Sequence, residues 1–160
     1  MSKVYRFQKT QVLPVNIEDA WDFFSSPQNL KAITPSHLGF TILSAQDDRY
    51  MYAGQLIEYE VKPLLGIPLY WMTEITQVSH LQYFIDEQRF GPYSFWHHQH
   101  HFKAVPGGVE MTDIVHYKVP FWVLGDIANT LFVRSQLKKI FDYREAVTVK
   151  AFERSSPVIS

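Results

Sequence analysis

Cysteine is absent from the 160-residue chain, which excludes disulfide bonds, thiolate nucleophiles and zinc sites built on sulfur. The absence fits a reducing compartment. The sequence also lacks any apolar run near the roughly 18 residues that a membrane span requires, and residues 1–7 lack the uninterrupted apolar core of a secretion signal. We therefore expect a cytoplasmic protein without a membrane span.

Charge of one sign is not in excess either, because 15 Lys and Arg residues accompany 16 Asp and Glu residues, for a formal net charge of −1. No basic block of the kind that follows a phosphate backbone is present, so we expect no nucleic-acid partner. Aromatic side chains are numerous, with 12 Phe, 9 Tyr and 4 Trp. This composition indicates a wide interior that large side chains fill or line.

The first third of the chain predicts one strand and two short helices. Residues 5–13 carry the apolar spacing of an opening strand. Asn16 is a good cap for the helix that follows, and Ser26 with Pro27 favours the start of a second short helix. That helix should end before Pro35, because the residue before a proline is biased away from helix.

From residue 40 onward the apolar period is two, which is typical of strands. Short connections with turn signals separate six candidate strands, so neighbours should pair antiparallel in a meander. The candidates are residues 40–45, 54–62, 69–78, 81–89, 95–104 and 109–119.

The last part of the chain predicts a long helix. Nothing after Pro120 breaks a helix from residue 124 to about residue 153, and the apolar residues form one broad face. The length favours a single domain, which we place at residues 1–154, with a disordered tail at 155–160. The predicted fold class is α+β, a curved antiparallel sheet of about seven strands that grips one C-terminal helix.

Four histidines fall within residues 95–102, on the fifth of the six candidate strands. Successive side chains of a strand point to opposite faces. His98 and His100 should therefore share one face of the sheet, while His97 and His101 share the other. The histidines form two pairs rather than one cluster.

Four segments, together with the order of the elements, resemble the START/Bet v 1-like (SRPBCC) superfamily. They are FIDEQRFGPY (84–93), WHHQH (96–100), TDIVHYKVP (112–120) and FDYR (141–144). The chain is more narrowly similar to an uncharacterised bacterial branch, some of whose relatives are labelled cell division inhibitor-like. The resemblance covers nearly the whole chain and implies a helix-grip fold with a cavity between the concave sheet and the C-terminal helix. Because the superfamily includes lipid carriers, polyketide cyclases, hormone receptors and ring-hydroxylating oxygenase domains, the resemblance does not identify a ligand.

The concave face can be chosen as the face that carries the bulkier side chains. The other face carries more charged residues in most of the strands, which supports this choice. The side chains on the concave face and one cation of the long helix are the predicted ligand-binding residues. They are Tyr59, Trp71, Phe84, Asp86, Trp96, His98, His100, Asp113, Tyr117 and Arg144.

Asp86, His98, His100 and Asp113 fall on three consecutive predicted strands and on one face. Buried carboxylates need partners, and the imidazoles next to them can supply these. Three interpretations are open: a hydrogen-bonded structural set, a polar patch that contacts a ligand, and a divalent metal site. We predict neither a metal nor another cofactor.

Arg144 shares a face of the long helix with Leu137 and Ile140, where a cation is unusual. It could pair with Asp86 or Asp113 across the cavity, or bind an anionic group of a ligand. It could also extend past the edge of the sheet into solvent.

Three functions follow from these patterns. The one we favour is non-enzymatic binding of a small hydrophobic or aromatic molecule, lipid- or polyketide-like, in the cavity. The second is an enzyme of the cyclase or dehydratase kind, with His98 or His100 and a carboxylate such as Asp113 as general acid or base. The third is a protein-interaction module that uses the outer strands or the loop 63–68. No nucleophile motif, phosphate loop or dinucleotide fingerprint supports the enzyme, and the oligomeric state stays open.

Overall fold

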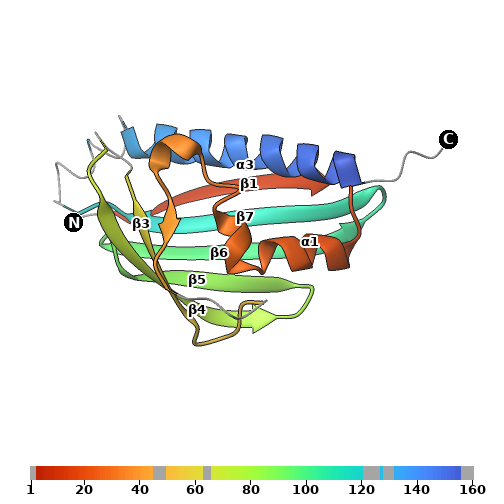
Figure 1. Cartoon of the computed structure of the whole chain (residues 1–160), viewed down its shortest axis with the longest axis horizontal. Coiled ribbons are helices and arrows are strands. Elements are labelled where there is room, and N and C mark those ends of the chain that lie inside the picture. Colours follow the sequence, from red (N-terminus) through yellow and green to blue (C-terminus); the bar gives the residue numbers. More distant parts are fainter. Residues whose placement is uncertain (1–2, 45–49, 63–65, 121–126, 128–131, 156–160) are drawn as a thin grey trace.

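The computed structural model describes the chain in five parts, which are residues 3–44, 50–62, 66–120, 127 and 132–155. The described strands are β1 (Tyr5–Leu13), β2 (Thr41–Ile42), β3 (Leu56–Val61), β4 (Leu69–Ser79), β5 (Tyr83–Phe90), β6 (Phe95–Val105) and β7 (Gly108–Lys118). They form one antiparallel sheet in the order β1-β7-β6-β5-β4-β3-β2 (Figure 1). The α+β fold class is thereby confirmed, and the first strand of the chain lies beside the last.

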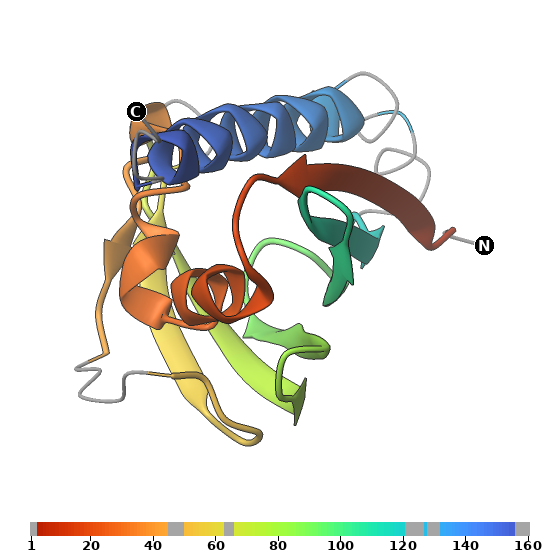
Figure 2. The ribbon, with the colours of Figure 1, turned by 90° about the vertical axis from the view of Figure 1, so that its right-hand side faces the viewer.

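The sheet curves strongly, so that β3 and β4 stand at a steep angle to β1 and β7 (Figure 2). The pairing of β4 with β5 shifts register between Met72 and Thr73 and again between Ile75 and Gln77. Register shifts of this kind bend a strand and increase its twist. The bent sheet has a concave face, and the helices lie on that side of it.

Helix α1 (Ile17–Phe24) begins where the sequence predicts, because the side-chain oxygen of Asn16 accepts a hydrogen bond from the Asp19 amide at 2.8 Å. Its apolar face packs against the sheet. Trp21 makes edge contacts with Phe84 of β5, at 6.0 Å between ring centroids, and with Phe102 of β6, at 5.5 Å. Helix α1 therefore closes one end of the concave face.

The second predicted helix is only a 3₁₀ turn, η1 (Pro27–Leu30), and a further turn, η2 (Ser36–Leu38), follows it. Side chains explain why the helix is short. The side-chain amide of Asn29 donates to the Phe23 carbonyl at 2.9 Å, and the Thr34 hydroxyl donates to the Leu30 carbonyl at 2.6 Å. Such local hydrogen bonds compete with helix continuation.

The strand predicted at residues 40–45 is reduced to the two residues of β2. The amides of Leu43 and Ser44 both donate to the Glu58 carbonyl, at 2.8 and 3.3 Å, which ends the regular ladder. Residue 45, the predicted turn at 47–48, residues 63–65 of the predicted loop and residues 156–160 of the predicted tail lie outside the described residues.

Helix α3 (Arg134–Ser155) lies across the concave side of the sheet (Figures 1 and 2). The predicted helix began at residue 124, but residues 124–126 and 128–131 lie outside the described part of the chain. In that part, no helix combines the length and the apolar character needed to cross a membrane. The helix lies closest to β1 and β7 and leaves β4 and β5 further away (Figure 2).

Two separate apolar clusters hold α3 against the sheet. Leu137 and Phe141 pack with Val115 and Tyr117 of β7, whereas Phe152, near the other end of the helix, belongs to the larger cluster around α1. Burial of large apolar side chains at both ends fixes the position of the helix, since each contributes about 1.5–3 kcal/mol. Between the sheet and the part of α3 from Leu137 to Arg144, a cavity remains.

Lys9 of β1 adds a polar contact to this attachment, because its ammonium group pairs with Asp142 and, at 2.6 Å, with Glu145 of α3. We expect Lys9→Met to lower the free energy of unfolding by about 1 kcal/mol or less at about pH 7, the range for partly exposed pairs. Hydrogen bonds from Lys138 and Lys9 lower the pKa of Asp142.

A carboxyl group with a lowered pKa stabilises the fold above its unfolded pKa of about 3.9 and loses that contribution as the pH falls through the folded value. The difference between Lys9→Met and the unmodified chain should therefore shrink between about pH 4 and pH 2.5. Urea unfolding at the two ends of this range measures it. A difference of equal size at about pH 2.5 would show that packing, not charge, is responsible.

Candidate ligand-binding site

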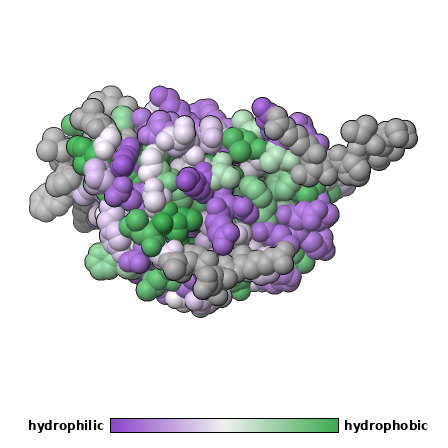
Figure 3. Space-filling model, viewed as in Figure 1, coloured by the Kyte–Doolittle hydropathy of each residue, from purple (hydrophilic) through white to green (hydrophobic). Residues whose placement is uncertain are grey.

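A cavity of about 390 Å³ lies between the concave face of the sheet, the segment from α1 to η2, and α3. Residues of both apolar clusters contribute to its walls. Most of its lining side chains are aromatic or aliphatic. On the face shown in Figure 3, apolar side chains also reach the surface in a patch to the left of α1, with polar residues on either side.

The structure brings together nine of the ten predicted ligand-binding residues. Those that line the cavity are Tyr59 of β3, Trp71 of β4, Phe84 and Asp86 of β5, Trp96, His98 and His100 of β6, Asp113 of β7 and Arg144 of α3. Tyr117 is 1% exposed and does not line the cavity, because it packs between Tyr5 and Tyr93, with ring centroids 5.7 and 6.0 Å away.

The two pairs of histidines lie on opposite faces of β6, as the alternation predicts. His98 and His100 are buried on the concave face, at 4% and 6% exposure. On the outer face, a ring nitrogen of His97 lies 2.6 Å from the Glu87 carboxylate, and His101 contacts Gln99 at 2.9 Å. The outer pair therefore belongs to the surface and the inner pair to the cavity.

The inner pair is enclosed by Asp86 and Asp113, which come from the strands on either side of β6. Nε2 of His98 lies 2.9 Å from Oδ1 of Asp113, and Nε2 of His100 lies 2.7 Å from Oδ2 of Asp86. The remaining nitrogens face the other carboxylates. Nδ1 of His98 lies 3.4 Å from Asp86, and Nδ1 of His100 lies 3.0 Å from Asp113 without the alignment of a hydrogen bond.

These contacts come from cross-strand pairing. Asp86 pairs with His98, and His100 pairs with Asp113, so that all four side chains stand on one patch of the concave face. Neighbouring rings add further constraint. The His100 ring stacks on Phe84 with centroids 4.1 Å apart, and the two imidazoles lie 3.7 Å apart.

The four groups shift one another's pKa values in different directions. Burial and the neighbouring His100 lower the pKa of His98. Burial alone would also lower the pKa of His100, but its contacts with the Asp113 and Asp86 carboxylates raise it. Burial disfavours the charged form of Asp113, yet the two imidazoles hold its pKa well below the usual range. Burial likewise disfavours the charged form of Asp86, but the imidazoles lower its pKa. The arrangement favours two carboxylates with one charged imidazole.

Arg144 reaches the cavity from α3 and lies over the Phe141 ring, 5.2 Å from its centroid. Within the described residues, its guanidinium forms no ion pair with Asp86 or Asp113 at 4.0 Å or less, so the predicted pairing across the cavity is not a direct contact. Its positive charge still helps to lower the pKa of Asp86. Arg144 is a cation held beside an apolar cavity.

Two hydrogen-bond donors of the cavity wall lack an acceptor. Nε1 of Trp71 and Nε of Arg144 are buried and have no hydrogen-bond partner among the described residues. By contrast, the Tyr59 hydroxyl is satisfied by the Thr73 hydroxyl at 2.8 Å. Buried donors without partners are uncommon in folded proteins, and an acceptor on a bound molecule would satisfy these two.

Sequence reasoning missed the part of the lining that comes from outside the sheet's predicted inner face. Met51 lines the cavity from an irregular segment without a periodic signal, and Leu38 and Phe40 line it from η2 and the residues just after it. Leu137, Ile140 and Phe141 line it from α3, and their helical spacing could have identified them. Gln88 alternates with Asp86 and Phe84 along β5, but it does not line the cavity, because its side-chain amide donates to the Tyr93 carbonyl at 2.6 Å and accepts from the Tyr93 amide at 3.2 Å.

Comparison with known proteins gives a likeness in structure. No family model and no curated protein matches the chain. A START superfamily protein from Mycobacterium smegmatis is similar with a TM-score of 0.70 at 12% identity, over 94% of this chain and 99% of that one. Major latex-like protein 151 from Panax ginseng is similar with a TM-score of 0.68 at 8% identity, over 93% and 97%. Protein Ms6760 from Mycobacterium smegmatis is similar with a TM-score of 0.68 at 13% identity, over 97% and 99%. At these identities the likeness concerns the fold.

Proposed function

We propose that this chain, which has the helix-grip fold of the START and Bet v 1-like proteins, binds a small apolar molecule in the cavity beneath α3. The observation that carries the proposal is the cavity itself. Its volume of about 390 Å³ lies within the range of about 300–1,000 Å³ that is typical of small-molecule sites. Its walls are chiefly apolar and aromatic, with a few polar groups that can orient a ligand.

The proposed ligand has a flat or chain-like apolar body and an oxygen atom that accepts hydrogen bonds. The apolar body would pack against Tyr59, Trp71 and Trp96, whose rings contact one another at 5.8 and 5.4 Å. The oxygen would accept from Arg144 or from the Trp71 indole, the donors that lack partners. Apolar walls with a few placed donors are the usual way in which such sites combine affinity with orientation.

Two measurements test the proposal. Native mass spectrometry after mild purification should detect a small molecule bound at one per chain, and fluorescence titration with the apolar dye N-phenyl-1-naphthylamine should saturate at the same stoichiometry. The dye and the extracted molecule should compete. A chain that carries no guest and binds the dye without saturation would contradict the proposal.

Arg144→Leu is expected to distinguish the contribution of the ligand's polar group to affinity from that of its apolar body. It should weaken binding of the sulfonate dye 1-anilinonaphthalene-8-sulfonate by about tenfold or more, since a hydrogen bond to a charged group contributes about 1.5–3 kcal/mol. The affinity for N-phenyl-1-naphthylamine, which lacks the sulfonate, should change little. Fluorescence titration of both dyes measures the difference.

Lys139→Leu is the matched control, because Lys139 is an exposed cation on the same helix. It should leave both affinities unchanged. An equal loss for both dyes in Arg144→Leu would indicate a general disturbance of the cavity rather than a lost donor.

A second candidate function is acid–base chemistry of the cyclase or dehydratase kind on the bound molecule. The observation in its favour is that His98 faces the cavity while the buried Asp113 carboxylate holds its Nε2 at 2.9 Å. A carboxylate that orients an imidazole is a common arrangement of a general base. Mass spectrometry of the guest would show loss of one water with the unmodified chain and none with His98→Ala, while both bind the guest.

A further inference from the structure

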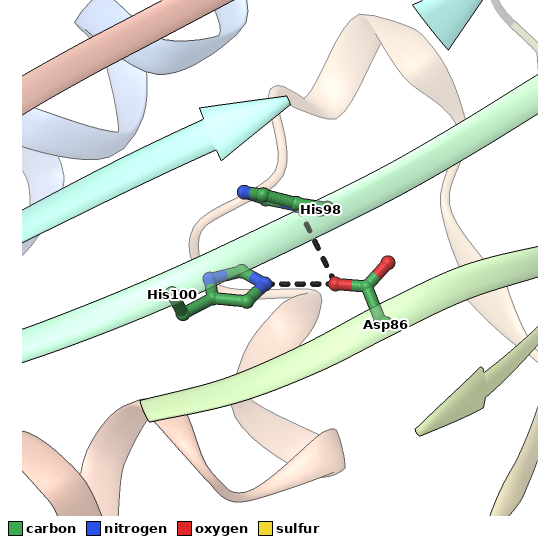
Figure 4. Close-up of side chains that lie close together, drawn as sticks. All are labelled: Asp86, His98 and His100. Atoms are coloured by element: carbon green, nitrogen blue, oxygen red, sulfur yellow. Dashed lines mark hydrogen bonds and ion pairs between the residues drawn. The ribbon is translucent and has the colours of Figure 1, made fainter. Parts of the chain in front are cut away.

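Three potential metal ligands converge on the wall of the cavity. They are Oδ2 of Asp86, a ring nitrogen of His98 and a ring nitrogen of His100, and these atoms all lie within 4.8 Å of one another (Figure 4). Oδ2 of Asp86 lies 2.7 Å from Nε2 of His100 and 3.4 Å from Nδ1 of His98. The three side chains stand on the paired strands β5 and β6, a rigid support for a metal site.

Asp113 of β7 faces the other nitrogen of each ring. Oδ1 of Asp113 lies 2.9 Å from Nε2 of His98 and 3.0 Å from Nδ1 of His100. Histidines that bind metals usually direct their second ring nitrogen toward a carboxylate or carbonyl, which fixes the tautomer and the ring orientation. One carboxylate here faces both rings on the side away from Asp86.

A metal ion at this point would take the place of a proton. Nε2 of His100 hydrogen-bonds Oδ2 of Asp86 at 2.7 Å, so that a proton lies between them in the metal-free chain. When both rings carry their N–H groups toward Asp113, Nδ1 of His98 and Nε2 of His100 present lone pairs beside the Asp86 carboxylate, and a divalent cation can bind all three with release of that proton. Among the described residues, no Lys or Arg forms an ion pair with Asp86 or Asp113.

We propose that Asp86, His98 and His100 bind one divalent transition-metal ion, such as Zn²⁺ or Fe²⁺, with Asp113 as the positioning residue. Two imidazoles and one carboxylate are a donor set that both ions accept. Three protein ligands leave coordination positions open, and these would face the cavity, where water or an oxygen of a guest can occupy them. The proposal goes beyond binding of an apolar molecule, which needs no metal.

The access route also fits a metal site. Asp86, His98 and His100 line the cavity rather than the sealed core, so that an ion can reach them from the same space as a ligand. The apolar surroundings would limit the number of competing water molecules. The outer face of β6, with His97 and His101, offers no group of three such ligands among the described residues.

Isothermal titration calorimetry with Zn²⁺ tests the proposal, using chain freed of metal by a chelator and dialysis, without an organic ligand. We expect one ion per chain and loss of saturable binding in His98→Ala and His100→Ala. His97→Ala and His101→Ala, on the same strand and the opposite face, should bind like the unmodified chain. Asp113→Asn should keep one site but weaken it by about 10- to 100-fold, as expected for a positioning residue.

Titration with Co²⁺ gives a second readout that does not depend on the folding of any variant. A visible absorption band that saturates at one Co²⁺ per chain and disappears on addition of Zn²⁺ supports the site. Absence of saturable Zn²⁺ binding by the unmodified chain would overturn the proposal, as would loss of binding in His97→Ala but not in His98→Ala. Dye binding in the presence of a chelator tests the apolar cavity without a metal. The proposal of apolar-ligand binding and the proposal of a metal site can therefore fail independently of each other.

Discussion

The double substitution Ile57→Trp with Val61→Trp is expected to lower the affinity for N-phenyl-1-naphthylamine by about tenfold or more. Both residues stand on β3 and line the cavity, at 1% and 8% exposure. Two indole rings there would occupy a substantial part of the volume of about 390 Å³. Removing about 60 Å² of dye surface from apolar contact costs about 1.5 kcal/mol, which is roughly a factor of ten in affinity.

Stability of the double variant provides an independent check. Inserting large side chains into a packed core costs about 1–3 kcal/mol for each site, because neighbouring side chains must move. A cavity can accept them, so we expect the free energy of unfolding to fall by less than about 1 kcal/mol or to rise. Denaturant unfolding measures this, and the circular dichroism spectrum should be unchanged.

The matched control is Glu58→Trp with Glu60→Trp, which places the same two rings on the outer face of the same strand. This variant should bind the dye like the unmodified chain. Equal losses in both double variants would mean that the dye binds outside the cavity. Full affinity in the inner variant would also contradict the proposed site.

Asp113→Ala is expected to lower the free energy of unfolding by about 3 kcal/mol, when measured with a chelator present. Asp113 is 4% exposed and faces His98 at 2.9 Å and His100 at 3.0 Å. Removing one partner from a buried charged network costs about 3–5 kcal/mol, because the remaining polar groups stay buried without compensation. The cavity beside the cluster admits water, which places the expected value at the lower end of this range.

Glu87→Ala is the control for this prediction, because Glu87 of β5 faces His97 of β6 at 2.6 Å on the outer face of the sheet. Partly exposed pairs contribute about 1 kcal/mol or less, so the variant should be nearly as stable as the unmodified chain. Urea unfolding of both variants gives the comparison. Similar losses for Asp113→Ala and Glu87→Ala would show that the inner cluster contributes no special stability.

Much of the fold was predictable because local rules and tertiary structure agree. Asn16 caps α1, and the alternation along β6 separates His98 and His100 from His97 and His101, as the sequence indicates. Period two combined with short turns also gave the antiparallel order of the strands. Once each strand's inner face was known, pairing alone placed Asp86 and Asp113 next to the histidines.

The remainder depends on packing that strand periodicity does not contain. Tyr117 lies on the inner face, yet it is covered by Tyr5 and Tyr93 and belongs to the apolar cluster that includes Leu137 of α3. Met51 reaches the cavity from an irregular segment, and no pattern marks it. The position of the helix over the sheet decides which inner residues are core and which line the cavity.

The measurement that tests the central claim most directly is a ¹H–¹⁵N spectrum of the tryptophan indole groups during titration with N-phenyl-1-naphthylamine. Trp71 and Trp96 line the cavity, whereas Trp21 of α1 is 3% exposed in the core and does not line it. We expect saturable shifts of the Trp71 and Trp96 indole signals at one dye per chain, with the Trp21 signal nearly unchanged. Saturation of dye binding with both signals unmoved would show that the space beneath α3 is not the binding site.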